Sequence, residues 1–211
     1  MTCNENVVKL INFFNLHEGQ FETITQNTPY YHMGATITDA ILQAGLNYNN
    51  VVYPRVKKLL FQFPQYRTTC DFIILFQTIP LDKLIEWKNE RKLNSIIELS
   101  WLFQKKSIEN EDQLSIWLDN EDNISALKSI KGIGPKTIDY LKMLSGNQAI
   151  AIDRHLFSFL RLAGVVVSSY EEASTIYKEA AKILKLTNHE MDSKIWLFMS
   201  SNQKKTMLVN T

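Results

Sequence analysis

Cysteine is scarce in this 211-residue sequence, which contains only Cys3 and Cys70. Two cysteines cannot supply the four thiolates of an iron–sulfur cluster, and no Cys/His cluster with the spacing of zinc ligands accompanies them. Two distant cysteines also fit a reducing compartment. We therefore expect neither an iron–sulfur cluster nor a zinc site.

Long apolar segments are missing as well. No run of about 18 apolar residues is present, which predicts that no segment spans a membrane. The N-terminal sequence MTCNENVVKLINFF has neither a basic start nor a long apolar region, which predicts no signal peptide. Internal repeats and low-complexity linkers are absent too, and 45% of the residues are hydrophobic. The chain can therefore bury a sizeable core, and we expect residues 1–211 to form one globular protein.

Hydrophobic periodicity is helical almost throughout, and prolines mark several loops. The β-branched run at 165–167 is too short and isolated to imply a sheet, so we predict an all-α protein. Residues 21–33 (FETITQNTPYYHM) fit no clear element and are expected to form a loop. The expected helices are Val7–Leu16, Ile37–Leu46, Asn50–Phe61, Thr69–Phe76, Leu81–Trp87, Lys92–Gln104, Gln113–Leu118, Ile124–Ser129, Pro135–Leu144, Asp153–Leu162, Tyr170–Leu184 and Met191–Met199.

The most informative segment is 129–155, SIKGIGPKTIDYLKMLSGNQAIAIDRH. Gly132 and Gly134 bracket Ile133, and Pro135 occupies the position expected for the first residue of a helix. A glycine turn at the start of a helix directs free backbone N–H groups outward, beside the positive end of the helix dipole. The segment therefore suits an anion such as a phosphate. The alternative is a helix–turn–helix corner that binds nothing.

Charge is segregated around this segment although the whole chain carries a formal charge of only +1. Between residues 124 and 161 the basic residues are Lys128, Lys131, Lys136, Lys142, Arg154 and Arg161, against the acidic Asp139 and Asp153. Residues 109–122 carry six acidic side chains and no basic one, as solvated helix ends often do. A locally cationic segment is expected where one face of a protein meets phosphate.

A lysine and an aspartate flank the predicted turn. Lys136 falls in the first turn of its helix, where a cation opposes the dipole, and this favours the free amine that a nucleophile needs. Asp153 follows the apolar run 149–152 and occupies a helix N-cap position, so it is either an ordinary cap or a partly desolvated catalytic carboxylate. Lys136 can likewise be read as a simple phosphate contact.

These residues resemble the helix–hairpin–helix DNA glycosylase superfamily, which includes endonuclease III and the 8-oxoguanine glycosylases. Its signature is an apolar-Gly-apolar-Gly hairpin, a lysine soon after it, and an aspartate that opens a later helix. Here the hairpin reads IKGIG over residues 130–134, KT follows at 136–137, and AIDRH occupies 151–155. This wording is most similar to the small archaeal-type 8-oxoguanine glycosylase/lyases. A weaker similarity extends from about residue 36 to residue 199.

The resemblance implies a two-lobed helix–hairpin–helix DNA glycosylase fold with its active site in the interlobe cleft. One lobe would comprise residues 36–130, and the other would join 1–35 to 131–211 and carry the hairpin. The loop at 21–33 would lie at the cleft. The implied partner is damaged double-stranded DNA, bound by a monomer that is not attached to a membrane. No cofactor is implied beyond a structural monovalent cation at the hairpin, and a prokaryotic chain would work in the cytoplasm, at the nucleoid.

The resemblance also implies a mechanism in which a damaged base is flipped out of the duplex. Lys136, as a free amine, attacks the sugar C1′ while Asp153 stabilises the developing positive charge. The base leaves, a Schiff base links Lys136 to the sugar, and β-elimination cuts the strand. The implied DNA contacts are Lys131, Gly132, Ile133, Gly134, Thr137 and His155. A lone histidine is otherwise more often a packed or capping residue.

Three further residues form the expected base pocket. Tyr140 lies one helical turn beyond Lys136, where an aromatic ring can stack on a base. Asp192 and Trp196 are four residues apart on one helix face, and this segment resembles the Asp-x-x-Ile-Trp helix of the family. A carboxylate beside an indole ring would suit an oxidised purine. The alternative is that they are a core tyrosine, a surface acid and a core tryptophan.

The leading expectation is therefore a DNA glycosylase with AP lyase activity that removes an oxidised purine, 8-oxoguanine above all. A glycosylase for oxidised pyrimidines or alkylated bases is an alternative within the same fold. A helix–hairpin–helix protein that binds DNA without enzymatic activity is a second alternative. The presence of both Lys136 and Asp153 favours the enzyme over the binding protein.

Overall fold

The computed structural model describes residues 5–21 and 29–209, with side chains as far as residue 201. Within these residues the regular structure is helical and no strand occurs, which confirms the predicted all-α class. The chain divides into two compact units: unit 1 contains residues 1–27 and 148–211, and unit 2 contains residues 28–147. No helix in the described ranges is long and apolar enough to cross a membrane.

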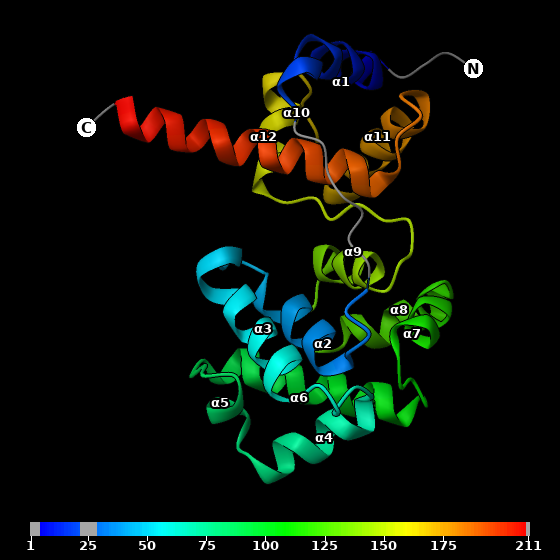
Figure 1. Ribbon diagram of the computed structural model, residues 1–211. Helices are drawn as coiled ribbons and strands as arrows, with labels where there is room; N and C mark the ends of the chain where they lie inside the picture. Colours follow the sequence, from blue (N-terminus) through cyan, green and yellow to red (C-terminus); the bar gives the residue numbers. More distant parts are fainter. Residues whose placement is uncertain (1–4, 22–28, 210–211) are drawn as a thin grey trace. The chain divides into compact units, whose positions relative to one another are not determined.

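Unit 2 is built around helix α2 (Met33–Leu42), which contacts α3, α4, α6 and α9 (Figure 1). All ten residues of α2 are buried, because the sequence MGATITDAIL offers no broad polar face and must be covered on every side. The other elements of unit 2 are η2 (Tyr48–Val52, a π-helical turn), α3 (Tyr53–Gln62), α4 (Thr69–Thr78), α5 (Leu81–Leu84), α6 (Glu90–Lys105), α7 (Glu111–Leu118), α8 (Glu121–Lys128) and α9 (Pro135–Leu144).

Helix α2 begins four residues before the predicted start at Ile37, because its N-terminus is capped by groups distant in the sequence. The His32 ring accepts a hydrogen bond from the Ala35 N–H at 3.2 Å. Glu111 of α7 accepts from the His32 N–H at 2.9 Å and from the Thr36 hydroxyl at 2.6 Å. Glu111 is therefore buried, and it does not behave as one of the solvated helix-end acids expected for residues 109–122.

Unit 1 joins the N-terminal helix to the C-terminal helices. Its elements are α1 (Glu5–Leu16), η1 (Glu18–Gln20), α10 (Arg154–Leu162), α11 (Tyr170–Ile183) and α12 (Asn188–Val209). Helix α1 contacts α11, and both α10 and α11 contact α12 (Figure 1). The Phe159 ring lies near the centre of this core, 5.0 Å from the ring of Phe13 and 5.9 Å from that of Phe198.

The division between the units differs from the limits expected at residues 35/36 and 130/131. The hairpin and α9 belong to unit 2, because Ile130, Ile133, Ile138 and Leu141 are buried in its core cluster with residues of α2 and α6. The change of unit comes after Asn147, where α9 has ended.

Candidate functional site

The hairpin connects α8 to α9 by a tight turn. The Ile130 N–H donates to the Leu127 carbonyl at 3.1 Å, and the Ile133 N–H donates to the Ile130 carbonyl at 3.1 Å. Gly132 has a φ of +95°, a conformation that side-chain-bearing residues rarely adopt. Gly134 is the N-cap of α9 and has no side chain to satisfy the first N–H groups of the helix. These N–H groups therefore lie at a glycine-bounded helix start, as an anion site requires.

Helix α6 supports the hairpin through Ser95, whose buried hydroxyl donates to the Lys131 carbonyl at 2.8 Å. A Cβ at Gly132 would lie 3.5 Å from the Ser95 hydroxyl and 3.9 Å from Nε of Arg91, so φ rather than space requires glycine there. The contact also places Arg91, which is exposed, beside the turn. Together with the exposed Lys131 it gives the hairpin two cations from different elements.

Lys136 lies half-buried in the first turn of α9, which spans Pro135–Leu144 as the sequence predicts. Its neighbour Lys92, on α6, donates to the carbonyls of Ile41 at 2.6 Å and Ala44 at 2.8 Å, at the C-terminal end of α2. Burial lowers the pKa of Lys92, and the charges of Arg91 and Lys136 lower it further. Lys136 is therefore part of a cluster of amines and guanidinium groups next to the hairpin.

A buried carboxyl, Asp39 of α2, is surrounded by tyrosine hydroxyls. The Tyr30 hydroxyl donates to Oδ2 of Asp39 at 2.7 Å, and the Tyr140 hydroxyl lies 3.3 Å from both carboxyl oxygens. The hydroxyls of Tyr30 and Tyr48 are 3.2 Å apart. These four side chains, called here the Asp39 cluster, join α2, η2 and α9 within unit 2.

Burial raises the pKa of Asp39 to about 7, although hydrogen bonds from Tyr30 and Tyr140 act in the opposite direction. In the described part of the chain, Asp39 forms no ion pair that would offset its desolvation. Burial and the Asp39 charge also raise the pKa of Tyr140 well above its ordinary value. The cluster therefore holds a carboxyl that is partly protonated at neutral pH beside tyrosines that stay protonated.

In unit 1, Asp153 is the N-cap of α10. Its Oδ1 accepts hydrogen bonds from the His155 N–H at 2.7 Å and from the Leu156 N–H at 3.1 Å. The side chain is half-buried and directly follows the buried run 149–152. Asp153 thus has the capping role that the sequence allowed, and this role is compatible with an additional electrostatic one.

The remaining predicted residues of unit 1 gather around the same helix start. The His155 side chain is buried, and its ring lies 5.8 Å from the Trp196 ring in an edge-to-face arrangement. Asp192 and Trp196 are half-buried on α12. Burial raises the pKa of Tyr177, whose hydroxyl donates to the Leu156 carbonyl at 2.7 Å, and the charges of Asp192 and Asp153 raise it further. Both carboxylates therefore lie near Tyr177.

A protein-family model matches this chain. The family model described as "Domain of unknown function (DUF8548)" matches residues 88–200, which is more than half of the chain. The chain belongs to this family. The matched range includes the hairpin, α9, α10 and all of the other predicted site residues. A search of curated proteins finds no match.

A solved structure shares the fold of this family member. It is the crystal structure of an H. pylori 3-methyladenine DNA glycosylase (MagIII) bound to 1,N6-ethenoadenine. The TM-score is 0.61 with 13% sequence identity, over 96% of this chain and 99% of that chain. The expected fold of a helical DNA glycosylase is thereby confirmed, and at this identity the likeness concerns the fold alone.

In this family member the predicted site residues fall into two groups, each described within its own unit. Unit 2 carries Lys131, Gly132, Ile133, Gly134, Lys136, Thr137 and Tyr140, and unit 1 carries Asp153, His155, Asp192 and Trp196. Because the Ile133 and Thr137 side chains are buried and the Ile133 N–H is bonded within the turn, a phosphate at the hairpin would meet the backbone N–H groups of the first turn of α9, such as that of Thr137. The assignment of these residues to DNA and to the base stays a prediction.

Sequence reasoning did not single out Asp39 and Tyr30, or the hairpin neighbours Arg91 and Ser95. One signal for Asp39 was present: it is the only charged residue in the otherwise apolar and small-residue segment MGATITDAIL. A lone acid in a helix that is buried on all sides needs hydrogen-bond partners. Nothing in the sequence indicated that these partners would be tyrosines from three separate segments.

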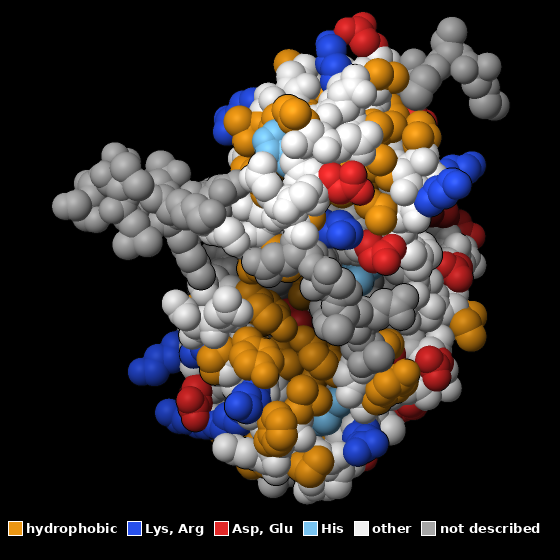
Figure 2. Space-filling view, turned by 45° about the horizontal axis from the view of Figure 1, so that its top comes forward, with side chains coloured by type: hydrophobic (Ala, Val, Ile, Leu, Met, Phe, Trp, Pro, Cys, Tyr) orange, Lys and Arg blue, Asp and Glu red, His pale blue; other side chains and the backbone are white. Residues whose placement is uncertain are grey.

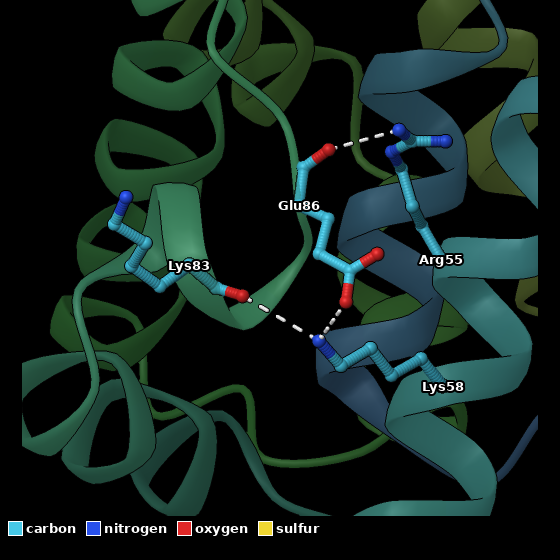
Figure 3. Close-up of polar contacts among 4 residues, drawn as sticks. All are labelled: Arg55, Lys58, Lys83 and Glu86. Atoms are coloured by element: carbon cyan, nitrogen blue, oxygen red, sulfur yellow. Dashed lines mark hydrogen bonds and ion pairs between the residues drawn. The ribbon is translucent and has the colours of Figure 1, made fainter.

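A second polar region of unit 2 contains none of the predicted residues. A depression of about 490 Å³ is lined by Arg55, Glu86, Trp87, Lys88 and Asn89. Beside it, Lys58 forms an ion pair with Glu86 at 2.7 Å, and Arg55 donates to the Glu86 carbonyl at 2.8 Å (Figure 3). These bonds hold the segment that follows α5 against α3. Glu86 belongs to this segment and adopts a φ of +51°. Figure 2 shows lysine and arginine side chains gathered at one edge of unit 2, on the lower left of the view.

Proposed function

We propose that the protein is a DNA glycosylase with AP lyase activity that removes an oxidised purine, 8-oxoguanine above all, through a Schiff base on Lys136. The observation that carries this proposal is the position of Lys136, two residues after a glycine hairpin and in the first turn of α9, in a chain with a DNA glycosylase fold. In the superfamily that the sequence resembles, members that only excise bases usually lack this lysine. The substrate is damaged double-stranded DNA, and the protein acts as a monomer without a metal cofactor, in the cytoplasm if it is prokaryotic.

Each group has a role that its environment supports. The hairpin N–H groups, with Arg91 and Lys131, hold a backbone phosphate next to the flipped nucleotide. Lys136 attacks C1′, and Asp153 stabilises the positive charge that develops on the sugar. Tyr140, Asp192 and Trp196 hold the base, and His155, whose ring packs edge to face with Trp196, contacts the DNA. β-Elimination from the Schiff base then cuts the strand.

Borohydride trapping tests the lyase step, because reduction of a Schiff base links protein and DNA covalently. Wild type should be trapped on a duplex with an abasic site, and Lys136→Gln should not be trapped although it still binds the duplex. Lys142→Gln, which removes a lysine later on the same helix, is the matched control and should be trapped like wild type. Trapping of Lys136→Gln at the wild-type level would mean that another amine is the nucleophile.

The preferred base is tested by single-turnover cleavage of duplexes that differ in one lesion. We expect 8-oxoguanine to be removed well ahead of thymine glycol and 3-methyladenine. Asp192→Ala should reduce this preference, because a purine N–H left without an acceptor in a dry pocket costs about 1–3 kcal/mol. Equal rates on 8-oxoguanine and thymine glycol would overturn the oxidised-purine assignment.

A glycosylase for alkylated bases is the second candidate. The observation in its favour is that the structure sharing this fold is that of a 3-methyladenine DNA glycosylase. The same lesion panel separates the two candidates, since this one requires 3-methyladenine to be removed fastest. A DNA-binding protein without enzymatic activity would bind the duplexes, cleave none of them and give no trapped complex.

A further inference from the structure

The Asp39 cluster contains a carboxyl that can donate a proton in the proposed reaction. Its carboxyl is wholly buried, yet it is joined by a hydrogen bond to Tyr140, which lies one helical turn from Lys136 on α9. The titratable groups that face Asp39 are Tyr30 from the segment before α2, Tyr48 from η2 and Tyr140 from α9. Lys92 of α6 reaches carbonyls at the end of α2 instead, and α3 and α4 add no group that shifts the pKa of Asp39.

We infer that Asp39 is a positioning residue that delivers a proton to the departing base through the hydroxyl of Tyr140. This inference rests on the proposed glycosylase activity and adds to it the source of the proton. Oδ2 of Asp39 is held by the shorter bond from Tyr30, so Oδ1 can carry the proton that faces Tyr140. The raised pKa keeps a substantial fraction of this carboxyl protonated at neutral pH.

Two proton transfers accompany the cleavage of the bond between C1′ and the base. Asp39 gives its proton to the oxygen of Tyr140 while Tyr140 gives its own hydroxyl proton to a nitrogen of the base. The C1′–N bond breaks and its electron pair stays with the base, which leaves as a neutral molecule. The lone pair of Lys136 forms the new bond to C1′, and the ammonium so formed releases a proton to water. Asp39, now a carboxylate, accepts hydrogen bonds from Tyr30 and Tyr140 until it regains a proton from water.

This proton source identifies the class of base that the site suits. An uncharged purine such as 8-oxoguanine would leave as an anion unless it is protonated, so an acid accelerates its departure. A purine alkylated on a ring nitrogen is already cationic and leaves as a neutral base without a proton. The Asp39 cluster therefore favours uncharged lesions and gives no advantage for cationic ones.

The test is single-turnover excision of 8-oxoguanine and of 7-methylguanine by the full chain, from about pH 5.5 to about pH 8.5. Wild-type excision of 8-oxoguanine should fall as the pH rises through about 7. Asp39→Asn keeps the shape of the side chain but holds no acidic proton, and Tyr140→Phe interrupts the path. Both variants should lose about tenfold or more of the 8-oxoguanine rate at low pH and no longer show the fall with rising pH. Excision of 7-methylguanine by Asp39→Asn should change by less than about twofold. Tyr66→Phe, which removes a hydroxyl elsewhere in unit 2, should match wild type.

The outcomes separate this inference from the proposed function. An unchanged fall with pH in Asp39→Asn or in Tyr140→Phe would overturn the inference while leaving the glycosylase in place. Equal losses on both bases in Asp39→Asn would also overturn it, because they indicate a structural role. A wild type that excises neither base would overturn the glycosylase and this inference together. Borohydride trapping of Asp39→Asn on abasic DNA, where no base departs, should equal that of wild type if the variant is folded.

Discussion

The hydroxyl of Tyr140 lies 3.3 Å from both carboxyl oxygens of Asp39, which links α9 to the buried helix at the centre of unit 2. Lys136 is on α9 as well, so the helix that presents the proposed nucleophile is fixed by a hydrogen bond to a titratable core. The stability of unit 2 and the geometry of the proposed site should therefore respond to the same ionisation.

The first prediction is that Asp39 makes the protein less stable as the pH rises. The pKa of Asp39 is about 7 in the folded protein and near 3.9 in the unfolded chain. The stabilisation that Asp39 gives the folded state is therefore fully present below about pH 4 and is lost as the pH rises through 7. The free energy of unfolding of Asp39→Asn, relative to that of wild type, should therefore increase by about 1.4 kcal/mol per pH unit between about pH 5 and pH 7. Urea unfolding of both proteins at the two pH values measures this difference.

Tyr140→Phe provides the matched variant for that measurement. The Tyr140 hydroxyl lowers the pKa of Asp39, so its removal should raise this pKa further and move the loss of stability to higher pH. A stability difference between wild type and Asp39→Asn that is the same at both pH values would show that Asp39 does not titrate in this range.

The second prediction separates the two roles of Asp153. Asparagine is a good N-cap, so Asp153→Asn should unfold within about 0.5 kcal/mol of wild type, whereas Asp153→Ala should lose about 1 kcal/mol. Both variants lack the carboxylate and should excise the base about 100-fold or more slowly, with duplex binding retained. Near-normal excision by Asp153→Asn would leave Asp153 as a structural cap only.

The third prediction concerns the hairpin turn. Gly132→Ala places a side chain at a φ of +95°, so it should destabilise the protein by about 1–2 kcal/mol and weaken duplex binding. Gly19→Ala is the control, because Gly19 has no atom within 4 Å of a new Cβ and a φ outside the left-handed region. Thermal unfolding and fluorescence anisotropy measure the two effects. Equal behaviour of the two variants would show that the turn tolerates a side chain.

The fourth prediction is that Arg91 contacts a DNA phosphate beside the hairpin. Arg91→Gln should reduce the slope of log affinity against log salt by about 1, as the loss of one phosphate contact requires. Lys178→Gln changes an exposed lysine on α11 in unit 1 and should leave the slope unchanged. Measurements on undamaged and damaged duplexes should agree, since a phosphate contact carries no information about the base.

The sequence alone determined the helical class and the hairpin with its following helix. A Gly-Ile-Gly turn, a proline at the first helical position and an apolar periodicity of 3.6 are local signals, and α9 begins and ends at the predicted residues. Asp153 was placed at a helix start for the same reason, because capping depends on the next three residues. The predicted start of α2 at Ile37 was wrong, because the cap of this helix involves Glu111, which lies 79 residues from His32 in the sequence.

Only the tertiary structure decided the environment of Asp39 and the support of the hairpin. Tyr30, Tyr48 and Tyr140 meet around Asp39 because η2 and α9 both contact α2, and no local pattern encodes these contacts. Ser95 likewise reaches the hairpin across 36 residues of sequence. A pKa depends on burial and on partners brought together by folding, so the sequence could name an acid but not its proton affinity.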